Sequence, residues 1–145
     1  LRAPLLFDPG ERWEYGIGLD WVGRIIEITS GKILEAFLQE NILRPLGMTD
    51  TSFTLRDDMK SRLVSLVSRG PDGGLSAVKS KPWGDADFHS GGGGLYSTGP
   101  DYLRFTRMLL GGGALEGARV LAAETVALMG RNAIGDMILL YFVFS

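Results

Sequence analysis

The chain has 145 residues, of which 45% are hydrophobic and 22% are charged. These are the shares of an ordinary globular domain, so they exclude a disordered chain and a coiled coil. The formal net charge of −2 provides no electrostatic footprint for nucleic acid or for an anionic membrane. With no cysteine and a single histidine, His89, the sequence excludes disulfides and multi-histidine metal sites. We therefore expect no metal and no cofactor, and any hydrolase chemistry would need a base other than histidine.

The two ends of the chain show no targeting segment. The sequence starts at Leu1 without a basic region followed by an apolar stretch, so no signal peptide is visible in it. Residues 137–144 form an uncharged apolar run that is too short for a membrane-spanning helix of about 20 residues. This run predicts a buried strand, and we expect the chain to be a piece of a longer domain.

The first half of the sequence predicts two helices that form an α-helical lobe. Apolar residues recur at helical spacing over residues 19–29, and Gly31 stands where a C-terminal cap belongs. A second helix is predicted over residues 33–43, ended by Pro45 and Gly47. We expect the second helix to bury these side chains: Leu34, Phe37, Leu38 and Ile42.

The middle of the chain predicts a β-hairpin around the Gly- and Pro-rich turn at residues 69–74. Its second strand contains Ser76 and Lys79, which formally match the Ser-x-x-Lys nucleophile motif of penicillin-recognising hydrolases. That chemistry requires a helix, because residues three apart share a helical face but lie on opposite faces of a strand. We therefore interpret this segment as a solvated hairpin, with a catalytic role as the less favoured alternative.

Four glycines in a row, at residues 91–94, predict an irregular loop. Leu95 and Tyr96 follow where a phosphate-binding loop would carry lysine, so close approach of the backbone to a sheet or to the floor of a site is the better explanation. His89 with Ser90 and Gly91 formally resembles the third motif of the same hydrolases. The glycines argue against the strand that this motif needs, which favours a hydrogen-bonding or packing role for His89.

The last third predicts two more helices. Thr98 and Asp101 have capping-box spacing, and Pro100 suits a first helical turn. The predicted apolar face of this helix carries Tyr102, Phe105, Thr106 and Leu109, and the glycines at 111–113 end the helix. A short final helix is predicted over residues 123–129.

Four segments, in the same order, resemble the serine β-lactamase-related family, most closely the family VIII esterases that share the class C β-lactamase fold. Residues 6–27 resemble its second-motif region, and residues 41–53 resemble the segment after its long helix. Residues 91–105 and 119–129 resemble two later segments. Four ordered segments are far more specific than any single motif.

The resemblance implies an α+β fold, a partial β-lactamase and penicillin-binding transpeptidase-like fold with a helical lobe and part of an antiparallel sheet. Residues 1–145 would be a fragment of that single domain. In this family, the serine of an upstream Ser-x-x-Lys attacks an ester or β-lactam carbonyl, and the lysine and a tyrosine move its proton. Tyr15 occupies the tyrosine position, so the resemblance implies that it is catalytic. Taken alone, Tyr15 could also be a packing anchor for its loop.

Departures from the family pattern refine this expectation. Ile17 replaces the Asn of the Tyr-x-Asn pattern, which favours an esterase over a lactamase. The resemblance makes Ile17, Gly92 and Gly93 candidate substrate-binding residues. The nucleophile segment and the third motif of the family have no counterpart in this chain, so we expect ester hydrolysis through an acyl-enzyme in a full-length parent and little activity of this chain alone.

Other interpretations stay open at this stage. The parent could be a β-lactamase or a D-Ala-D-Ala carboxypeptidase, so its small-molecule substrate would be an ester or a β-lactam. Alternatively, the chain could be a non-catalytic interaction fragment that self-associates through exposed apolar edges. The resemblance is compatible with either the bacterial cytoplasm or the periplasm.

Overall fold

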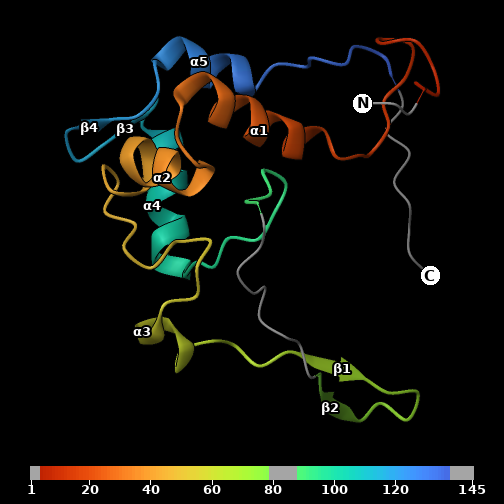
Figure 1. The fold of residues 1–145 in the computed structure, drawn as a ribbon, viewed down its shortest axis with the longest axis vertical. Coiled ribbons are helices and arrows are strands. Elements are labelled where there is room, and N and C mark those ends of the chain that lie inside the picture. The colour runs from red at the N-terminus through yellow and green to blue at the C-terminus, as the bar shows by residue number, and fades with distance from the viewer. Residues whose placement is uncertain (1–3, 79–87, 138–145) are drawn as a thin grey trace.

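A computed structural model describes residues 4–78 and 88–137 of the chain. Most helices gather in one body, and a β-hairpin extends away from it (Figure 1). In chain order, the elements are α1 (Gly18–Ser30), α2 (Leu34–Leu38), the π-helix η1 (Gln39–Leu43), α3 (Asp57–Lys60), β1 (Val67–Arg69), β2 (Leu75–Ala77), α4 (Gly99–Leu110), β3 (Ala114–Leu115), β4 (Ala118–Arg119) and α5 (Ala123–Met129). The strand predicted for the terminal apolar run lies outside the described residues, except for Met137.

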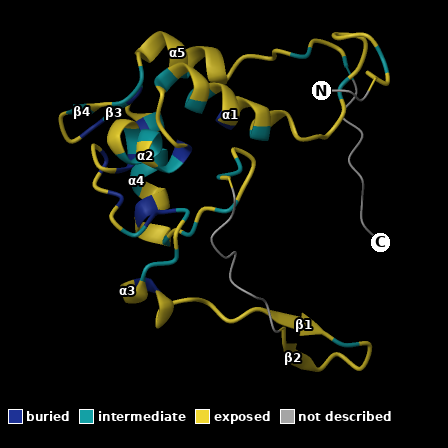
Figure 2. Cartoon of the chain, viewed as in Figure 1, coloured by how far each residue is buried: buried dark blue, intermediate teal, exposed yellow. Residues whose placement is uncertain are grey.

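The hydrophobic core lies between the segment that follows α2 and the helix α4. Leu46 and Met108 are completely buried, and the cluster around them is completed by Leu43, Met48 and Leu115. Buried residues concentrate where α2 and α4 lie, whereas the hairpin is exposed (Figure 2). Two segments more than 50 positions apart in the sequence therefore share one core.

The predicted apolar face of α4 is wrong at Tyr102. Tyr102 is 63% exposed, whereas Asp101 and Met108 are buried. One residue along a helix is a rotation of about 100°, so turning Asp101 inward directs Tyr102 to solvent. The start of the helix is as predicted, because the Thr98 hydroxyl accepts a hydrogen bond from the Asp101 N–H at 3.4 Å.

The second predicted helix has the expected extent but not a uniform geometry. Its first half, α2, is α-helical, and η1 continues it with the wider turns of a π-helix. At its end, the Arg44 N–H donates to the Gln39 carbonyl at 3.0 Å, a bond that spans five residues. Leu34 is buried as predicted, whereas Phe37, Leu38 and Ile42 are only half-buried and Leu43 takes the deepest position.

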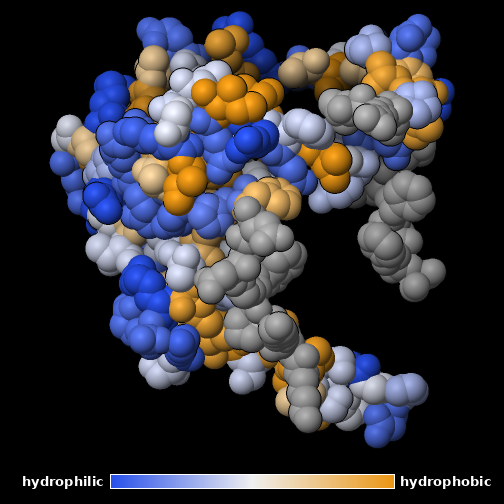
Figure 3. Space-filling view, in the orientation of Figure 1, coloured by the Kyte–Doolittle hydropathy of each residue, from blue (hydrophilic) through white to orange (hydrophobic). Residues whose placement is uncertain are grey.

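The first predicted helix, α1, is confirmed and ends at Gly31, whose φ of +69° is the left-handed conformation that glycine favours. Its apolar stripe is not covered by the described residues. Leu19, Val22, Ile25 and Ile28 are all exposed, and hydrophobic side chains are visible at the surface over α1 (Figure 3). Gly23 is the only buried residue of this helix.

The predicted hairpin is confirmed as the antiparallel pair β1–β2, in which Ser68 lies opposite Ser76. A second antiparallel pair, β3–β4, and the short helix α3 were not predicted. An isolated bridge joins Ser52 to Tyr96 and ties the segment after η1 to the glycine loop. None of the helices in the described part of the chain is long and apolar enough to cross a bilayer.

Candidate functional site

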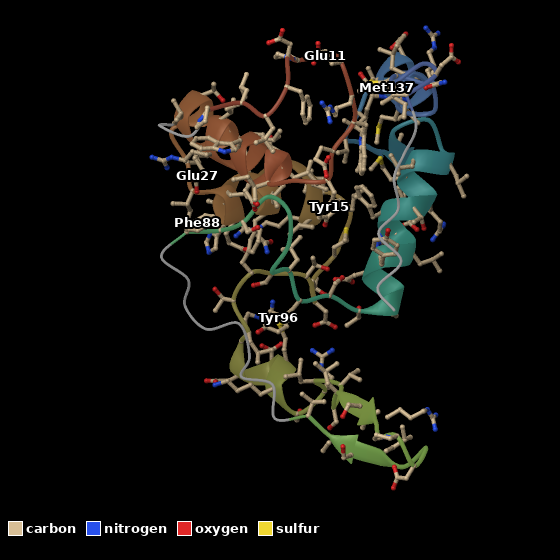
Figure 4. All side chains as sticks on the ribbon, turned by 90° about the vertical axis from the view of Figure 1, so that its right-hand side faces the viewer. Glu11, Tyr15, Glu27, Phe88, Tyr96 and Met137 are labelled. Atoms are coloured by element: carbon tan, nitrogen blue, oxygen red, sulfur yellow. The ribbon has the colours of Figure 1, made fainter. Side chains whose placement is uncertain are left out.

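Tyr15 lies in the loop that leads into α1, with its side chain 83% exposed (Figure 4). Its ring is 6.5 Å from the ring of Trp13, measured between centroids. An anchor that held the loop by burial would be covered, so this exposure argues against the packing alternative. The phenol is accessible to a group or a substrate approaching from outside the described residues.

The glycine loop lies directly against α1, as the close-approach interpretation predicts, although its neighbour is a helix. A β-carbon added to Gly23 would be 3.2 Å from the Cα of Gly91 and 3.0 Å from the Leu34 side chain. A β-carbon added to Gly91 would overlap the Leu19 carbonyl oxygen. The loop can therefore reach the helix only with glycine at position 91, whereas a side chain at position 23 would require its neighbours to shift by a few tenths of an ångström.

Asp20, in the first turn of α1, holds the glycine loop by hydrogen bonds. Its Oδ1 accepts from the Ser90 hydroxyl and from the Gly92 N–H, the latter at 3.1 Å. The Gly93 N–H points back to the Ser90 carbonyl at 3.5 Å. The N–H groups of Gly92 and Gly93, both predicted to bind substrate, are therefore used by Asp20 of α1 and by the loop itself.

A hollow of about 470 Å³ opens beside the N-terminal half of α1. Four of its lining residues lie at the N-cap or in the N-terminal half of α1, and the fifth lies shortly before the glycine loop. The five residues are Ile17, Asp20, Trp21, Arg24 and Phe88. The predicted substrate-binding residue Ile17 therefore lines this hollow, whereas Tyr15, Gly92 and Gly93 are not among its described lining residues. Trp21, Phe88 and Asp20 are site residues that the sequence did not indicate.

Arg24 is paired at the far edge of the hollow. Its guanidinium lies 2.8 Å from a carboxylate oxygen of Glu27, and the other oxygen of Glu27 accepts the Leu34 N–H at 3.0 Å. Arg24, and to a smaller extent the Leu34 N–H, hold the pKa of the Glu27 carboxyl below its ordinary value. Glu27 is thus an anion that ties α1 to the start of α2.

The structure bears out the packing role expected for His89. Its ring stacks on Phe53 with centroids 4.6 Å apart and planes 17° from parallel. The stretch around Ser90 is a bend followed by a turn, not the strand of a third motif. Ser90 uses its hydroxyl to hold Asp20.

Ser76 lies on the exposed strand β2, as the hairpin interpretation predicts. Its hydroxyl is 3.3 Å from the hydroxyl of Ser68 on the neighbouring strand. Lys79, its formal motif partner, lies outside the described residues. The strand geometry at Ser76 lacks the helical face that a Ser-x-x-Lys pair requires.

A buried polar network centres on the Asp101 carboxylate at the start of α4. The Asp101 carboxylate accepts the Asp50 N–H and the Thr51 hydroxyl, both at 2.8 Å. The Thr51 hydroxyl is also 2.8 Å from the Ser97 hydroxyl. The network joins the residues before α4 to the segment after η1. Within residues 4–78 and 88–137, no three His, Cys, Asp or Glu side chains gather where they could hold a metal ion.

Comparison with known proteins gives one consistent result. Residues 1–137 match the Beta-lactamase family. The chain is 41% identical over 113 residues to the lovastatin esterase of Penicillium rubens, covering 74% of this chain and 28% of that protein. It is 36% identical over 138 residues to the monacolin J acid methylbutanoyltransferase of Aspergillus terreus, covering 92% of this chain and 32% of that protein.

Solved structures agree with these relatives. A mutant of simvastatin synthase from Aspergillus terreus superimposes with a TM-score of 0.81 at 39% identity, over 91% of this chain and 33% of that one. A penicillin-binding protein homologue from Pyrococcus abyssi gives a TM-score of 0.65 at 25% identity, over 84% of this chain and 26% of that one. The chain thus spans about a third of the length of the curated relatives that it matches.

Proposed function

Because the chain belongs to the beta-lactamase family, we propose that it serves acyl transfer from an ester, with Tyr15 as a group that moves the proton. The observation that carries this proposal is the exposed position of Tyr15 at the entrance of α1, two residues before the hollow begins at Ile17. Relatives named as an esterase and as acyltransferases support an ester as the substrate.

The proposed reaction runs through an acyl-enzyme. A serine hydroxyl attacks the ester carbonyl carbon and passes its proton to a lysine–tyrosine pair that includes Tyr15. The tetrahedral intermediate collapses, the C–O bond to the alcohol breaks, and the alcohol leaves with a proton from the pair. Water or an acceptor alcohol then attacks the acyl-enzyme and releases the acid or a new ester.

A neighbouring cation is essential to this role. A free tyrosine has a pKa of about 10 and is a poor base at neutral pH. An ammonium group beside a phenol favours the phenolate, which makes a tyrosine a better proton acceptor. We propose that the lysine of a Ser-x-x-Lys motif elsewhere in the whole protein supplies this charge.

The nucleophile is proposed to lie outside this chain. In the sequence, only Ser76 precedes a lysine by three positions, and Ser76 lies on an exposed strand. The chain would then supply the tyrosine and one wall of the substrate site, as a fragment of a single family domain. By itself it would turn over esters poorly, because loss of the nucleophile in a serine hydrolase costs about a million-fold, as in the subtilisin example.

A β-lactam substrate is the less favoured alternative. Ile17 offers no amide to hold the side chain of a β-lactam, and it lines the hollow with an apolar surface. Acylation of a full-length parent by penicillin would reverse this preference.

A chimera tests the role of Tyr15. The part of this chain that aligns with the lovastatin esterase relative, 74% of its length, would replace its counterpart in that protein, which supplies the remainder of the domain. We expect ester hydrolysis in the chimera and a loss of about 10²–10⁴-fold in kcat on Tyr15→Phe, the usual contribution of a proton-transfer group. The matched control is Tyr102→Phe, an exposed tyrosine on α4, which should change kcat less than twofold, on the order of measurement error. A Tyr15→Phe chimera that is as active as its parent would disprove the role.

Labelling of the chain alone tests the position of the nucleophile. A fluorophosphonate probe followed by peptide mapping should give no serine adduct in a folded sample. An adduct on Ser76 would show that the local Ser-x-x-Lys is a real nucleophile and would overturn the strand argument. An adduct on Ser90 or Ser97 would move the active site to the glycine loop.

A further inference from the structure

The hollow beside α1 has walls that are unusually apolar for a surface. Three large hydrophobic side chains line it while remaining exposed: Ile17 at 67%, Trp21 at 44% and Phe88 at 63%. Small-molecule sites are typically cavities of about 300–1,000 Å³ with apolar and aromatic walls, and the hollow of about 470 Å³ falls within that range. Such a cavity is larger than a two- to four-carbon acyl group would need.

Each of the two charged residues that the described part of the chain places in the hollow has a partner of its own. Asp20 accepts hydrogen bonds from Ser90 and Gly92. Arg24 is paired with Glu27. A charged ligand would have to compete with these contacts and would lose hydration against the apolar walls, which disfavours its binding. An uncharged ligand would bury the apolar walls without this cost.

We propose that this hollow binds the bulky, uncharged apolar part of the ester substrate, with Trp21 and Phe88 as specificity-determining residues. This inference rests on the proposed ester chemistry, because it treats the hollow as part of the same site as Tyr15. The sequence continuity supports this link, since Ile17 lies at the edge of the hollow two residues after Tyr15. Two aromatic side chains in one cavity favour a ring system over a thin alkyl chain.

Two matched dyes test the chemistry of the hollow in the complete chain. N-phenyl-1-naphthylamine is neutral, and 8-anilino-1-naphthalenesulfonate carries the same rings with an added negative charge. We expect the neutral dye to bind more tightly and to quench the emission of Trp21. Trp21→Ala and Phe88→Ala should each weaken neutral-dye binding on the order of tenfold, because each removes one large apolar wall. Equal binding of the two dyes would overturn the proposal.

Control variants separate this hollow from other apolar surface and from misfolding. Leu110→Ala removes an exposed side chain at the end of α4, outside the hollow, and should leave dye binding unchanged. Far-UV circular dichroism and urea unfolding of Trp21→Ala should match the parent chain. Trp21→Phe, which keeps an aromatic wall, should restore most of the binding. Unchanged binding in Trp21→Ala and Phe88→Ala would place the dye elsewhere and disprove the site.

A kinetic readout distinguishes failure of this inference from failure of the proposed function. In the esterase chimera, Trp21→Ala should raise KM for a naphthyl ester much more than for a methyl ester of the same acid and leave kcat nearly unchanged. Tyr15→Phe should lower kcat and bind the neutral dye as the parent does. If the chimera lacks activity but dye binding depends on Trp21, the proposed ester chemistry is disproved and the proposed binding site in the hollow is retained. If the chimera is active but Trp21→Ala changes neither KM nor dye binding, only the proposed role of the hollow is disproved.

Discussion

Gly91 lies so close to Leu19 that a β-carbon at Gly91 would overlap the Leu19 carbonyl oxygen. This contact joins the glycine loop to the first turn of α1, directly after the loop that carries Tyr15. The Asp20 carboxylate reinforces it through Ser90 and Gly92. The position of the loop thus depends on the absence of a single side chain.

Gly91→Ala should destabilise the chain by about 1–3 kcal/mol, the usual cost of overpacking, because the added methyl must displace backbone atoms. Urea unfolding followed by circular dichroism measures the change. Gly93→Ala is the matched control, because a β-carbon there meets nothing within 4 Å. If the two variants were equally stable, the close approach would not contribute to the fold.

Asp101→Ala should destabilise the chain by about 1–3 kcal/mol, because it removes the carboxylate that accepts the part-buried Asp50 N–H and the buried Thr51 hydroxyl. Asp136→Ala, at an exposed aspartate, is the control and should change the free energy of unfolding by less than about 0.5 kcal/mol. Combining Asp101→Ala with Thr51→Val should cost less than the sum of the two single changes, since both act on one hydrogen bond. Strict additivity of the two changes would contradict the network.

The Asp50–Arg62 pair should make stability depend on acid pH. Arg62 forms two hydrogen bonds to the Asp50 carboxylate, at 2.7 and 2.8 Å, and these hold the pKa of Asp50 below its ordinary value. Because the pKa of Asp50 is lower in the folded state, the stabilisation is fully present above the ordinary pKa and is lost as the pH falls through the lowered one.

Arg62→Gln therefore tests this pair across a pH series. The difference in free energy of unfolding between the parent and the Arg62→Gln variant should be largest near neutral pH and should shrink in strong acid. Arg131→Gln provides a charge-matched control, because Arg131 is exposed and its backbone N–H donates to the Leu128 carbonyl. A difference that stayed constant with pH would show that Arg62 acts through packing and not through the carboxylate.

The exposed stripe on α1 predicts self-association. Large exposed apolar patches are typical of surfaces that contact other proteins. Sedimentation velocity should show a mass that rises with concentration, and Ile25→Glu combined with Ile28→Glu should reduce this rise. Leu110→Glu on α4 is the control for the added charge. A monomer at all concentrations would count against association through this face.

Local signals in the sequence were sufficient for most elements of the fold. Gly31 and Thr98 mark helix ends by their own conformational and hydrogen-bonding properties, and the turn at 70–74 determines the hairpin. The residues that match the β-lactamase-related family correctly indicated its fold. The short pair β3–β4 lacks such signals, because two residues per strand are too few to show alternation.

The candidate site was harder to predict because its contacts are distant in sequence. Asp20 meets Ser90 across 70 positions, and Asp101 meets Thr51 across 50. Nothing in the spacing of either residue indicates its partner. Asp101 fits a helix cap by sequence alone, and its burial follows only from packing of α4 against the segment after η1. The roles of Tyr15 and Ile17 rest on resemblance and stay predictions.

The exposed hairpin has a consequence for the continuity of the chain. The segments on either side of it are joined by the core around Met108, by the Ser52–Tyr96 bridge and by the contact of Gly91 with α1. The hairpin itself buries no strand residue. A protease cut in the turn at residues 70–74 would therefore leave two pieces that stay associated without a covalent link. The chain could accordingly be divided at this turn into two separately expressed pieces that associate. The same turn could also receive an inserted domain without disrupting the contacts between the two pieces.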